Sequence, residues 1–129
     1  MEQGLSRPAR DLLTSEPLTA HLATCRDGKP HVAPLWYDVQ GETIEVVTTG
    51  RKLTNLRENP KVALSVAKDD GPRAEWMVTV RGTATVVDDP EASEAATKRI
   101  NRKYDANESA WAENRLVRIA VGSSTHRIY

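Results

Sequence analysis

Cysteine, phenylalanine and long apolar runs are scarce or missing in this chain of 129 residues, and each absence excludes a class of protein. The single cysteine, Cys25, has no second cysteine in the chain with which to form a disulfide. No apolar run approaches the ~20 residues that a membrane-spanning helix needs. The first residues, MEQGLSRPARDLL, lack the apolar core of a signal peptide. We therefore expect a cytoplasmic protein that does not enter a membrane.

An excess of either charge is also missing, because 18 Lys and Arg residues balance 18 Asp and Glu residues. A neutral chain without phenylalanine offers no basic, aromatic-rich face, so nucleic-acid binding is not expected. The three histidines do not form a cluster with metal-ligand spacing, so no metal site is assigned. Any anion-binding site must therefore be built from a local group of residues.

The chain contains a succession of strand patterns without a repeat or a linker, which predicts one domain over residues 1–129. Asp27-Gly28 and Gln40-Gly41 each separate two apolar runs and are typical of tight turns between antiparallel strands. Gly82 interrupts the longest run, where a glycine indicates a bend or a bulge. Strands are expected at residues 19–26, 31–39, 43–49, 61–67, 75–87, 115–122 and 126–129.

Two segments have helical spacing instead. A short helix is expected over residues 52–58, because its leucines share one face and Pro60 cannot continue it. A longer amphipathic helix is expected over residues 88–104, with Asp89 as its cap and Pro90 at its first position. Together these elements predict a mainly β fold, a six- or seven-stranded antiparallel barrel with two or three short helices.

The stretch VVTTGRKLTNLRENP places two cations, Arg51 and Lys52, at the start of the short helix. Positive charge is disfavoured at a helix N-terminus, which carries partial positive charge and exposes N–H donors. With the hydroxyls of Thr48 and Thr49 beside them, the cations would form a cradle for a phosphate group. The alternative is an ordinary helix start, because exposed Arg and Lys there cost only a few tenths of a kcal/mol.

Three motifs bear on this choice: LATCRDGKPHVAPLWY, VVTTGRKLTNLRENPKVALSV and VTVRGTATVVDD. In this order and spacing the sequence resembles the pyridoxamine 5′-phosphate oxidase-like family of flavin-binding split β-barrels. The resemblance covers roughly residues 15–104 and is weaker towards the C-terminus. It implies a split barrel, and it implies a homodimer with the cofactor at the two-fold interface.

The resemblance also implies which residues hold the cofactor. The strand that includes Pro34 would run along the flavin ring, and Pro34 itself suits either an edge strand or a strand with a ligand beside it. Arg51 and Lys52 would hold the phosphate, and Met77 would contact the ring or ribityl chain across the dimer. The implied cofactor-binding residues are Ala33, Pro34, Leu35, Trp36, Thr48, Thr49, Arg51, Lys52 and Met77.

The implied chemistry is hydride transfer between a bound cofactor and a small organic redox substrate. The cofactor is expected to be FMN, with the deazaflavin F420 as the alternative. F420 carries a glutamate-bearing tail, so extra cations near the pocket mouth would favour it; the candidates are Arg57, Lys61, Arg7 and Arg10, unless they are simply solvated. The chain ends in GSSTHRIY, without the C-terminal motif of the true oxidase, so pyridoxamine phosphate oxidation is not expected. The other alternative is a protein that binds or carries the cofactor without turnover.

No side chain is assigned an acid–base role, because the cofactor supplies the hydride chemistry. Trp36 and Tyr37 are neighbours on a strand, so one is expected in the core while the other lines a pocket or an interface. Trp111 lies in a stretch without a clear pattern, where it would cap the barrel or cover the cofactor ring. Cys25 is expected to be a small buried hydrophobe and not a nucleophile.

Overall fold

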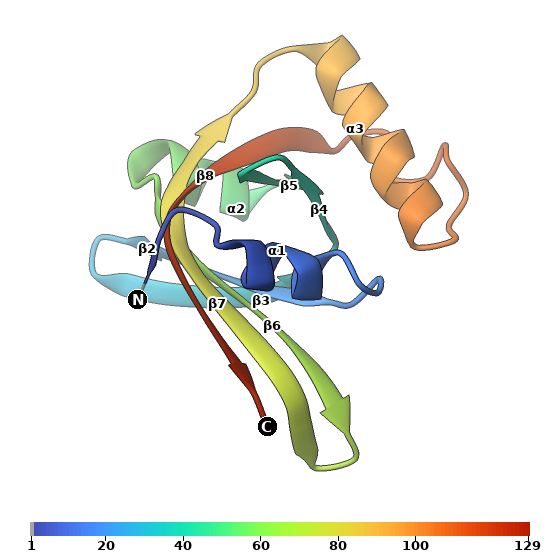
Figure 1. Cartoon of the computed structure of the whole chain (residues 1–129). Coiled ribbons are helices and arrows are strands. Elements are labelled where there is room, and N and C mark those ends of the chain that lie inside the picture. Colours follow the sequence, from blue (N-terminus) through green and yellow to red (C-terminus); the bar gives the residue numbers. More distant parts are fainter. Residues whose placement is uncertain (1) are drawn as a thin grey trace.

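The computed structural model describes residues 2–129 (Figure 1). Within these residues, eight strands and three helices follow one another along the chain. The elements are β1 (Glu2–Gln3), α1 (Arg7–Leu13), β2 (Ala20–Arg26), β3 (Lys29–Leu35), β4 (Tyr37–Gln40), β5 (Thr43–Thr48), α2 (Arg51–Glu58), β6 (Lys61–Asp70), β7 (Arg73–Val86), α3 (Pro90–Lys103) and β8 (Arg115–Ile128). The mainly β prediction is confirmed.

All strand pairs are antiparallel, and the strands form one sheet in the order β3-β2-β6-β7-β8-β5-β4, with the short β1 added on β8. The two ends of this path, β3 and β4, are consecutive in the chain and are separated only by Trp36. The sheet therefore curls round so that its two edges meet at Trp36. This is the expected split barrel, and we call the break at Trp36 the seam.

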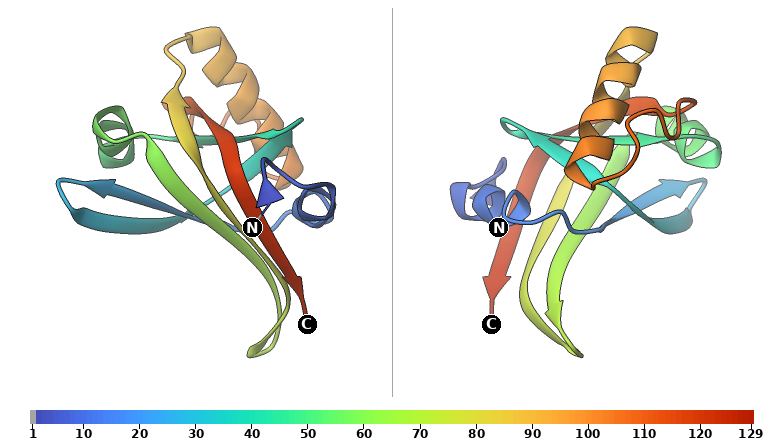
Figure 2. Two further views of the ribbon diagram at one scale, coloured as in Figure 1. Left: turned by 60° about the vertical axis from the view of Figure 1, so that its left-hand side comes forward. Right: turned by 90° about the vertical axis from the view of Figure 1, so that its right-hand side faces the viewer.

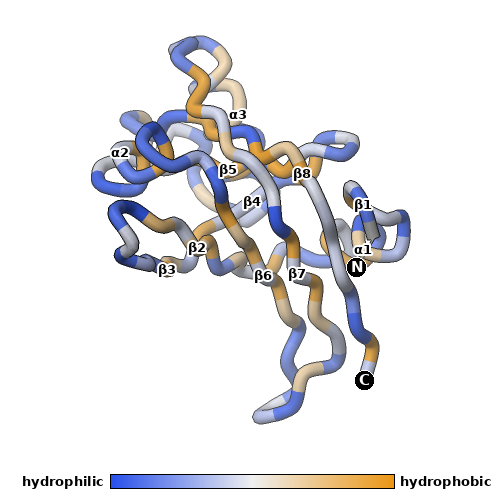
Figure 3. Tube along the Cα trace, turned by 90° about the vertical axis from the view of Figure 1, so that its left-hand side faces the viewer, coloured by the Kyte–Doolittle hydropathy of each residue, from blue (hydrophilic) through white to orange (hydrophobic). Residues whose placement is uncertain are grey.

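The barrel interior is filled by alternate residues of the strands, as the period of two requires. On β6, Val62, Leu64 and Val66 are buried while their neighbours are more exposed, which confirms the predicted alternation. On β7 the predicted apolar face is also buried, from Trp76 to Ala84. Figure 3 shows hydrophobic residues along the strands and hydrophilic residues at the hairpin tips.

Gly82 lies where the long β7 changes its pairing with β8, because the register shifts between Arg81 and Gly82. A Cβ atom at position 82 would lie 2.5 Å from the carbonyl oxygen of Ala120 and 2.9 Å from Cγ2 of Ile119. Only glycine allows the two backbones to approach this closely. The predicted bulge at this position is confirmed.

Three boundaries differ from the sequence-based predictions. The strand expected at residues 31–39 is broken at Trp36, because Lys103, the last residue of α3, and Tyr104, which follows it, bond to the backbone of Tyr37. The two strands expected at the C-terminus are one strand, β8, because residues 123–125 pair with β7 despite their turn-like composition. The helix α1 was not predicted; it is capped by Ser6, whose Oγ accepts from the N–H of Ala9 at 3.3 Å.

The three helices lie outside the sheet. Figure 2 shows α3 standing beyond β4 and β5, while α2 lies on another side of the barrel. The strands β6, β7 and β8 continue past the barrel as a long arm that ends at the β6–β7 turn and at the C-terminus. None of the helices in the described residues is long and apolar enough to cross a membrane.

Candidate functional site

A groove of about 340 Å³ lies at the seam of the barrel. It is bounded by the end of β3, the end of β5, the start of α2, and the end of α3 with the loop after it. Its size is at the lower end of the range for small-molecule sites. The lining residues are Pro34, Leu35, Trp36, Val47, Thr48, Thr49, Lys52, Asn101, Trp111 and Asn114.

The phosphate-cradle stretch forms one end of this groove. Gly50 has φ of 70°, the left-handed region that glycine adopts readily, and it turns the chain from β5 into α2. No side chain caps α2, and the first intrahelical donors are the N–H groups of Leu53 and Thr54. The N–H groups of Arg51 and Lys52 therefore have no intrahelical acceptor within residues 2–129, which is the arrangement that binds anions.

Six of the nine predicted cofactor residues meet in the groove: Pro34, Leu35, Trp36, Thr48, Thr49 and Lys52. Pro34 also lies on an edge strand, since β3 pairs only with β2 among the described strands. Thr48 is buried at 7 % exposure, whereas Thr49 is exposed at the rim. Thr48, Thr49 and Lys52, which one short motif supplies, thus line the same end of the groove.

The other three predicted residues do not line the groove of this chain. Ala33 pairs with Leu22 inside the β2–β3 hairpin, one residue before the groove begins. Arg51 is exposed at the first position of α2. Met77 lies on β7 opposite Arg127, and its Sδ accepts a hydrogen bond from the Tyr129 hydroxyl at 3.2 Å. The contact expected of Met77 across a dimer stays a prediction.

The far wall of the groove comes from α3 and the loop over residues 105–114; Trp111 of this loop lines the groove, as one of its two predicted positions requires, whereas the part played by Asn101 and Asn114 was not predicted. The amide of Asn101, which is 1 % exposed, donates to the carbonyl oxygens of Glu108 at 3.2 Å and Ala110 at 3.0 Å. These bonds hold the loop that carries Trp111, whose φ of 53° is unusual for a bulky residue. The loop has no hydrophobic period, so the sequence offers no signal for where it packs.

Aromatic side chains gather at the seam. The Trp36 ring stacks on the Tyr104 ring with centroids 4.7 Å apart, and the Trp111 ring packs edge-on against the Trp36 ring with centroids 5.2 Å apart. Tyr37, the neighbour of Trp36, is fully buried, and its hydroxyl donates to the carbonyl oxygen of Leu13 at 2.6 Å. The predicted division is confirmed, with Tyr37 in the core and Trp36 on the groove.

The end of α3 binds the backbone at the seam. The Tyr104 hydroxyl donates to the Leu18 carbonyl at 2.6 Å and accepts from the Tyr37 N–H at 3.3 Å. The Lys103 ammonium donates to the Tyr37 carbonyl at 2.8 Å and lies 3.9 Å from the centre of the Tyr37 ring. Because these contacts satisfy backbone groups that would otherwise be unpaired, they fix the break between β3 and β4.

Burial changes the proton affinity of this cluster. It raises the pKa of Tyr104 to about 12, an effect partly offset by the Tyr37 hydrogen bond. Burial also raises the pKa of Tyr37 well above its ordinary value, and the neighbouring Tyr104 adds to this increase. The pKa of Lys103 is lowered by burial. Both phenols therefore keep their protons to a higher pH than a tyrosine in water does.

We expect the free energy of unfolding to fall as the pH rises from about 10 through about 12. Unfolding returns Tyr104 to a pKa of about 10, so the folded state holds the proton more tightly and loses this advantage when the phenol ionises. The urea midpoint between pH 8 and pH 12 measures this loss, and Tyr104→Phe should make its slope shallower. An unchanged slope in that variant would contradict the assignment.

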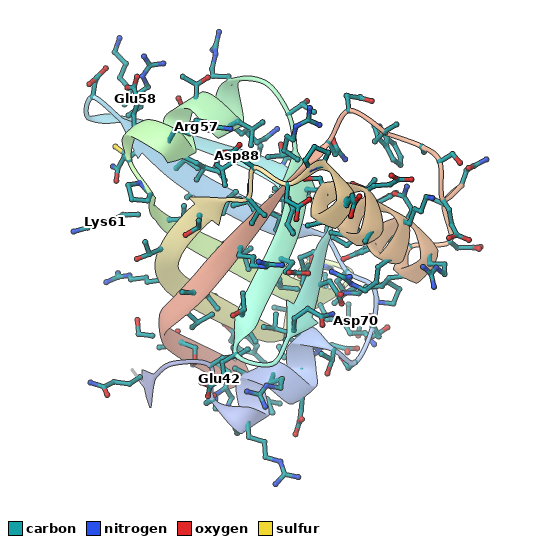
Figure 4. The ribbon with its side chains drawn as sticks, turned by 90° about the horizontal axis from the view of Figure 1, so that it is seen from above. Glu42, Arg57, Glu58, Lys61, Asp70 and Asp88 are labelled. Atoms are coloured by element: carbon teal, nitrogen blue, oxygen red, sulfur yellow. The ribbon has the colours of Figure 1, made fainter. Side chains whose placement is uncertain are left out.

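The cations considered for a deazaflavin tail lie elsewhere. Figure 4 shows Arg57 beside Asp88, and the two form an ion pair at 2.9 Å. Arg10, on α1, lies 3.8 Å from Glu42, which Figure 4 labels. Neither these arginines nor Arg7 and Lys61 are among the residues that line the groove within the described chain. They give the groove no second cluster of positive charge.

The remaining reactive residues form no second centre in the part of the chain that the structure describes. No group of three or more His, Cys, Asp and Glu side chains is placed to hold a metal ion in residues 2–129. Cys25 is partly exposed near the end of β2, which corrects the expectation of a buried side chain. It pairs with Pro30 of β3, outside the groove.

The family model for pyridoxamine 5′-phosphate oxidase matches residues 7–123. The chain belongs to this family. The match spans the whole barrel from α1 into β8, including every element that bounds the groove. The family resemblance of the three sequence motifs is therefore confirmed, and it extends beyond residues 15–104.

Several solved structures share the fold of this chain. An F420 reductase is 30 % identical, with a TM-score of 0.75 over 89 % of this chain and 94 % of that one. A FAD-binding protein of Mycobacterium smegmatis is 29 % identical, with a TM-score of 0.68 over 97 % and 98 % of the two chains. The heme storage protein HutZ of Vibrio cholerae is 20 % identical, with a TM-score of 0.73 over 95 % and 93 %, which shows the fold alone.

One curated relative matches only in part. It is an uncharacterized protein of Rhizobium meliloti (strain 1021), 36 % identical over 64 residues. The match covers 49 % of this chain and 42 % of the relative, less than half of either. This partial match shows sequence similarity and carries no information about function.

Proposed function

We propose that the groove at the seam binds a flavin-type redox cofactor and that the protein transfers hydride between it and a small organic substrate. The observation that carries the proposal is the meeting of Thr48, Thr49 and Lys52 with the uncapped start of α2 at one end of the groove. Hydroxyls, N–H groups and an ammonium in one place are the donors that a phosphate takes up. The similarity to the F420 reductase and the FAD-binding protein supports a cofactor of this class.

In this proposal each part of the groove has a role. Lys52 and the two threonines hold the phosphate, while Pro34, Leu35 and Trp36 lie along the ring. Backbone N–H groups along this edge, other than at Pro34, which has none, would stabilise negative charge that develops on the ring. The ring itself supplies the redox chemistry when bound, and the protein binds it, orients it and excludes water. FMN provides the ring and phosphate in their simplest form, and F420 is the alternative.

A homodimer is part of the proposal. Large apolar side chains are exposed on β3 and at the end of β8: Val32 at 64 %, Ile128 at 68 % and Tyr129 at 61 %. In such a dimer the second copy would cover these side chains. Arg51 and Met77 do not line the groove of their own chain. In the dimer, Met77 would contact the cofactor bound by the other copy, and Arg51 would contact the phosphate from outside the groove or from the other copy.

A binding or carrier protein without turnover is the second candidate, and it is favoured by the shared fold of a heme storage protein. Steady-state turnover separates the two. The reduced cofactor bound to the protein should be reoxidised by a panel of quinones and unsaturated carbonyl compounds faster than the free reduced cofactor. A carrier would bind the cofactor with the same affinity but give no acceptor-dependent acceleration.

A further inference from the structure

The face of the sheet that α3 covers carries a row of charged side chains. Asp38 of β4, Glu45 of β5 and Arg118 of β8 are direct cross-strand partners, so they lie side by side on this face. Glu45 is only 4 % exposed, and a carboxylate at this depth must be paired. Its Oε2 accepts from Nε of Arg118 at 3.0 Å, and its Oε1 accepts from Nη2 of Arg99 on α3.

Arg99 links α3 to two strands at once. Its Nε donates to Asp38 of β4 at 2.8 Å, while Nη2 of the same guanidinium bonds Glu45 of β5. Because the guanidinium is a rigid planar fork, bonds to two carboxylates define both the distance and the orientation of the side chain. Arg118 bonds the same Glu45 from β8, so its ion pair joins two strands and does not attach the helix.

Side-chain packing does not fill the space between this part of α3 and the sheet. A cavity of about 440 Å³ lies there, and its lining on the helix side is Ala92, Ala95, Ala96 and Arg99. The alanine side chains are too short to close the cavity, and an unfilled space forfeits the contacts that would otherwise fix the helix. The ion pairs of Arg99 therefore hold the middle of α3 on the sheet.

One turn later, the same face of α3 reaches the seam. Lys103 lies four residues after Arg99, and therefore on the same side of the helix. It donates to the Tyr37 carbonyl, and Tyr104 beside it accepts from the Tyr37 N–H and stacks on the Trp36 ring. A helical segment this short moves as one body, so a shift of α3 at Arg99 would reach the ring that lines the groove.

We propose that Arg99 is a positioning residue for the groove: by fixing α3 on β4 and β5, it sets the place of the Trp36 ring. Arg99 lines the cavity under α3 and not the groove, so it acts on a ligand without touching it. The placement of Trp36 is a property of the cofactor-free protein. Its effect on the cofactor ring rests on the proposed function, in which Trp36 lies along that ring.

The Arg99→Gln variant tests the placement of Trp36 in the cofactor-free protein. Glutamine keeps an amide donor but lacks the charge and the fork, and Arg118 still pairs the buried carboxylate, so the variant should fold. We expect the near-ultraviolet circular dichroism of the stacked Trp36 and Tyr104 rings to change towards that of a Trp36→Phe variant. Arg118→Gln is the matched control, because it takes an arginine from the same carboxylate without detaching α3, and its spectrum should match that of the original protein.

Titration with riboflavin and with FMN tests the effect on the cofactor ring. Riboflavin has the ring without the phosphate, so a displaced Trp36 should weaken both ligands by the same factor, roughly three- to tenfold, the size of one aromatic contact. Lys52→Ala should instead weaken FMN alone. Arg118→Gln should leave both affinities unchanged, although it removes an ion pair from the same row.

Equal spectra and equal affinities in Arg99→Gln and Arg118→Gln would overturn the proposal, since Arg99 would then only stabilise the fold. A changed spectrum with unchanged riboflavin affinity would also overturn it, because Trp36 would not contact the ring. If Arg99→Gln does not fold, Arg99→Lys takes its place, because it keeps the charge and loses the fork, and the same changes are expected at a smaller size. If the original protein binds neither ligand, the proposed function fails, and the spectrum alone decides whether Arg99 places Trp36.

Discussion

Replacing Lys52 with alanine is expected to weaken binding of the flavin-type cofactor by roughly 1.5 to 3 kcal/mol, or more than tenfold in Kd. The Lys52 side chain lines the groove beside Thr48 and Thr49, so its loss removes a charge-assisted hydrogen bond to the phosphate. Riboflavin, which has no phosphate, should bind the variant and the original protein equally. Fluorescence titration with FMN and riboflavin measures both effects.

Two further variants sharpen this result. Arg51→Ala should have a smaller effect, about 0.5 kcal/mol, because the side chain is exposed and lies outside the groove of its own chain. Lys29→Ala, an exposed lysine in the β2–β3 hairpin, is the control for a change in overall charge. Equal losses for Lys52→Ala and Lys29→Ala would mean that long-range charge, and not a phosphate site, governs binding.

Gly82→Ala is expected to lower the free energy of unfolding by about 3 kcal/mol. The new Cβ would lie 2.5 Å from a backbone oxygen of β8, so the two strands would have to separate at the bulge. Backbone atoms cannot move aside as a flexible side chain can. Urea or thermal unfolding followed by circular dichroism measures the loss.

Gly122→Ala is the matched control for this variant. It lies on β8 close to the same bulge, but its Cβ would meet only the Arg81 carbonyl oxygen at an ordinary 3.4 Å. We expect a change of about 0.5 kcal/mol or less. If both glycine variants lose the same stability, the close approach at position 82 is not what fixes the bend of β7.

The barrel was predictable because its signals are local. The turn at Asp27-Gly28, the alternation along β6 and the interruption at Gly82 each depend on neighbouring residues, and each prediction is confirmed. The end of the groove beside α2 was predictable for the same reason. Thr48, Thr49 and Lys52 are close in sequence, so a turn between a strand and a helix brings them together wherever that pair lies.

The seam and the far wall depend on contacts between distant segments. The apolar pattern continues through Trp36, and the strand breaks there because Lys103 and Tyr104 bond to Tyr37 from more than sixty residues away. Trp111 enters the groove on a loop that has no period of its own, and the loop is held by Asn101 of α3. The residues next to Trp36 and Trp111 in the sequence do not indicate which distant residues these segments contact.

Equilibrium titration of the cofactor-free protein with FMN and, side by side, with F420 tests the central claim most directly. We expect saturable binding of at least one of them, with one site per chain and a much lower affinity in Lys52→Ala. Absence of binding by both would contradict it. The Thr-Thr-Gly-Arg-Lys turn would then be only the start of a helix, in a split barrel that has a different function.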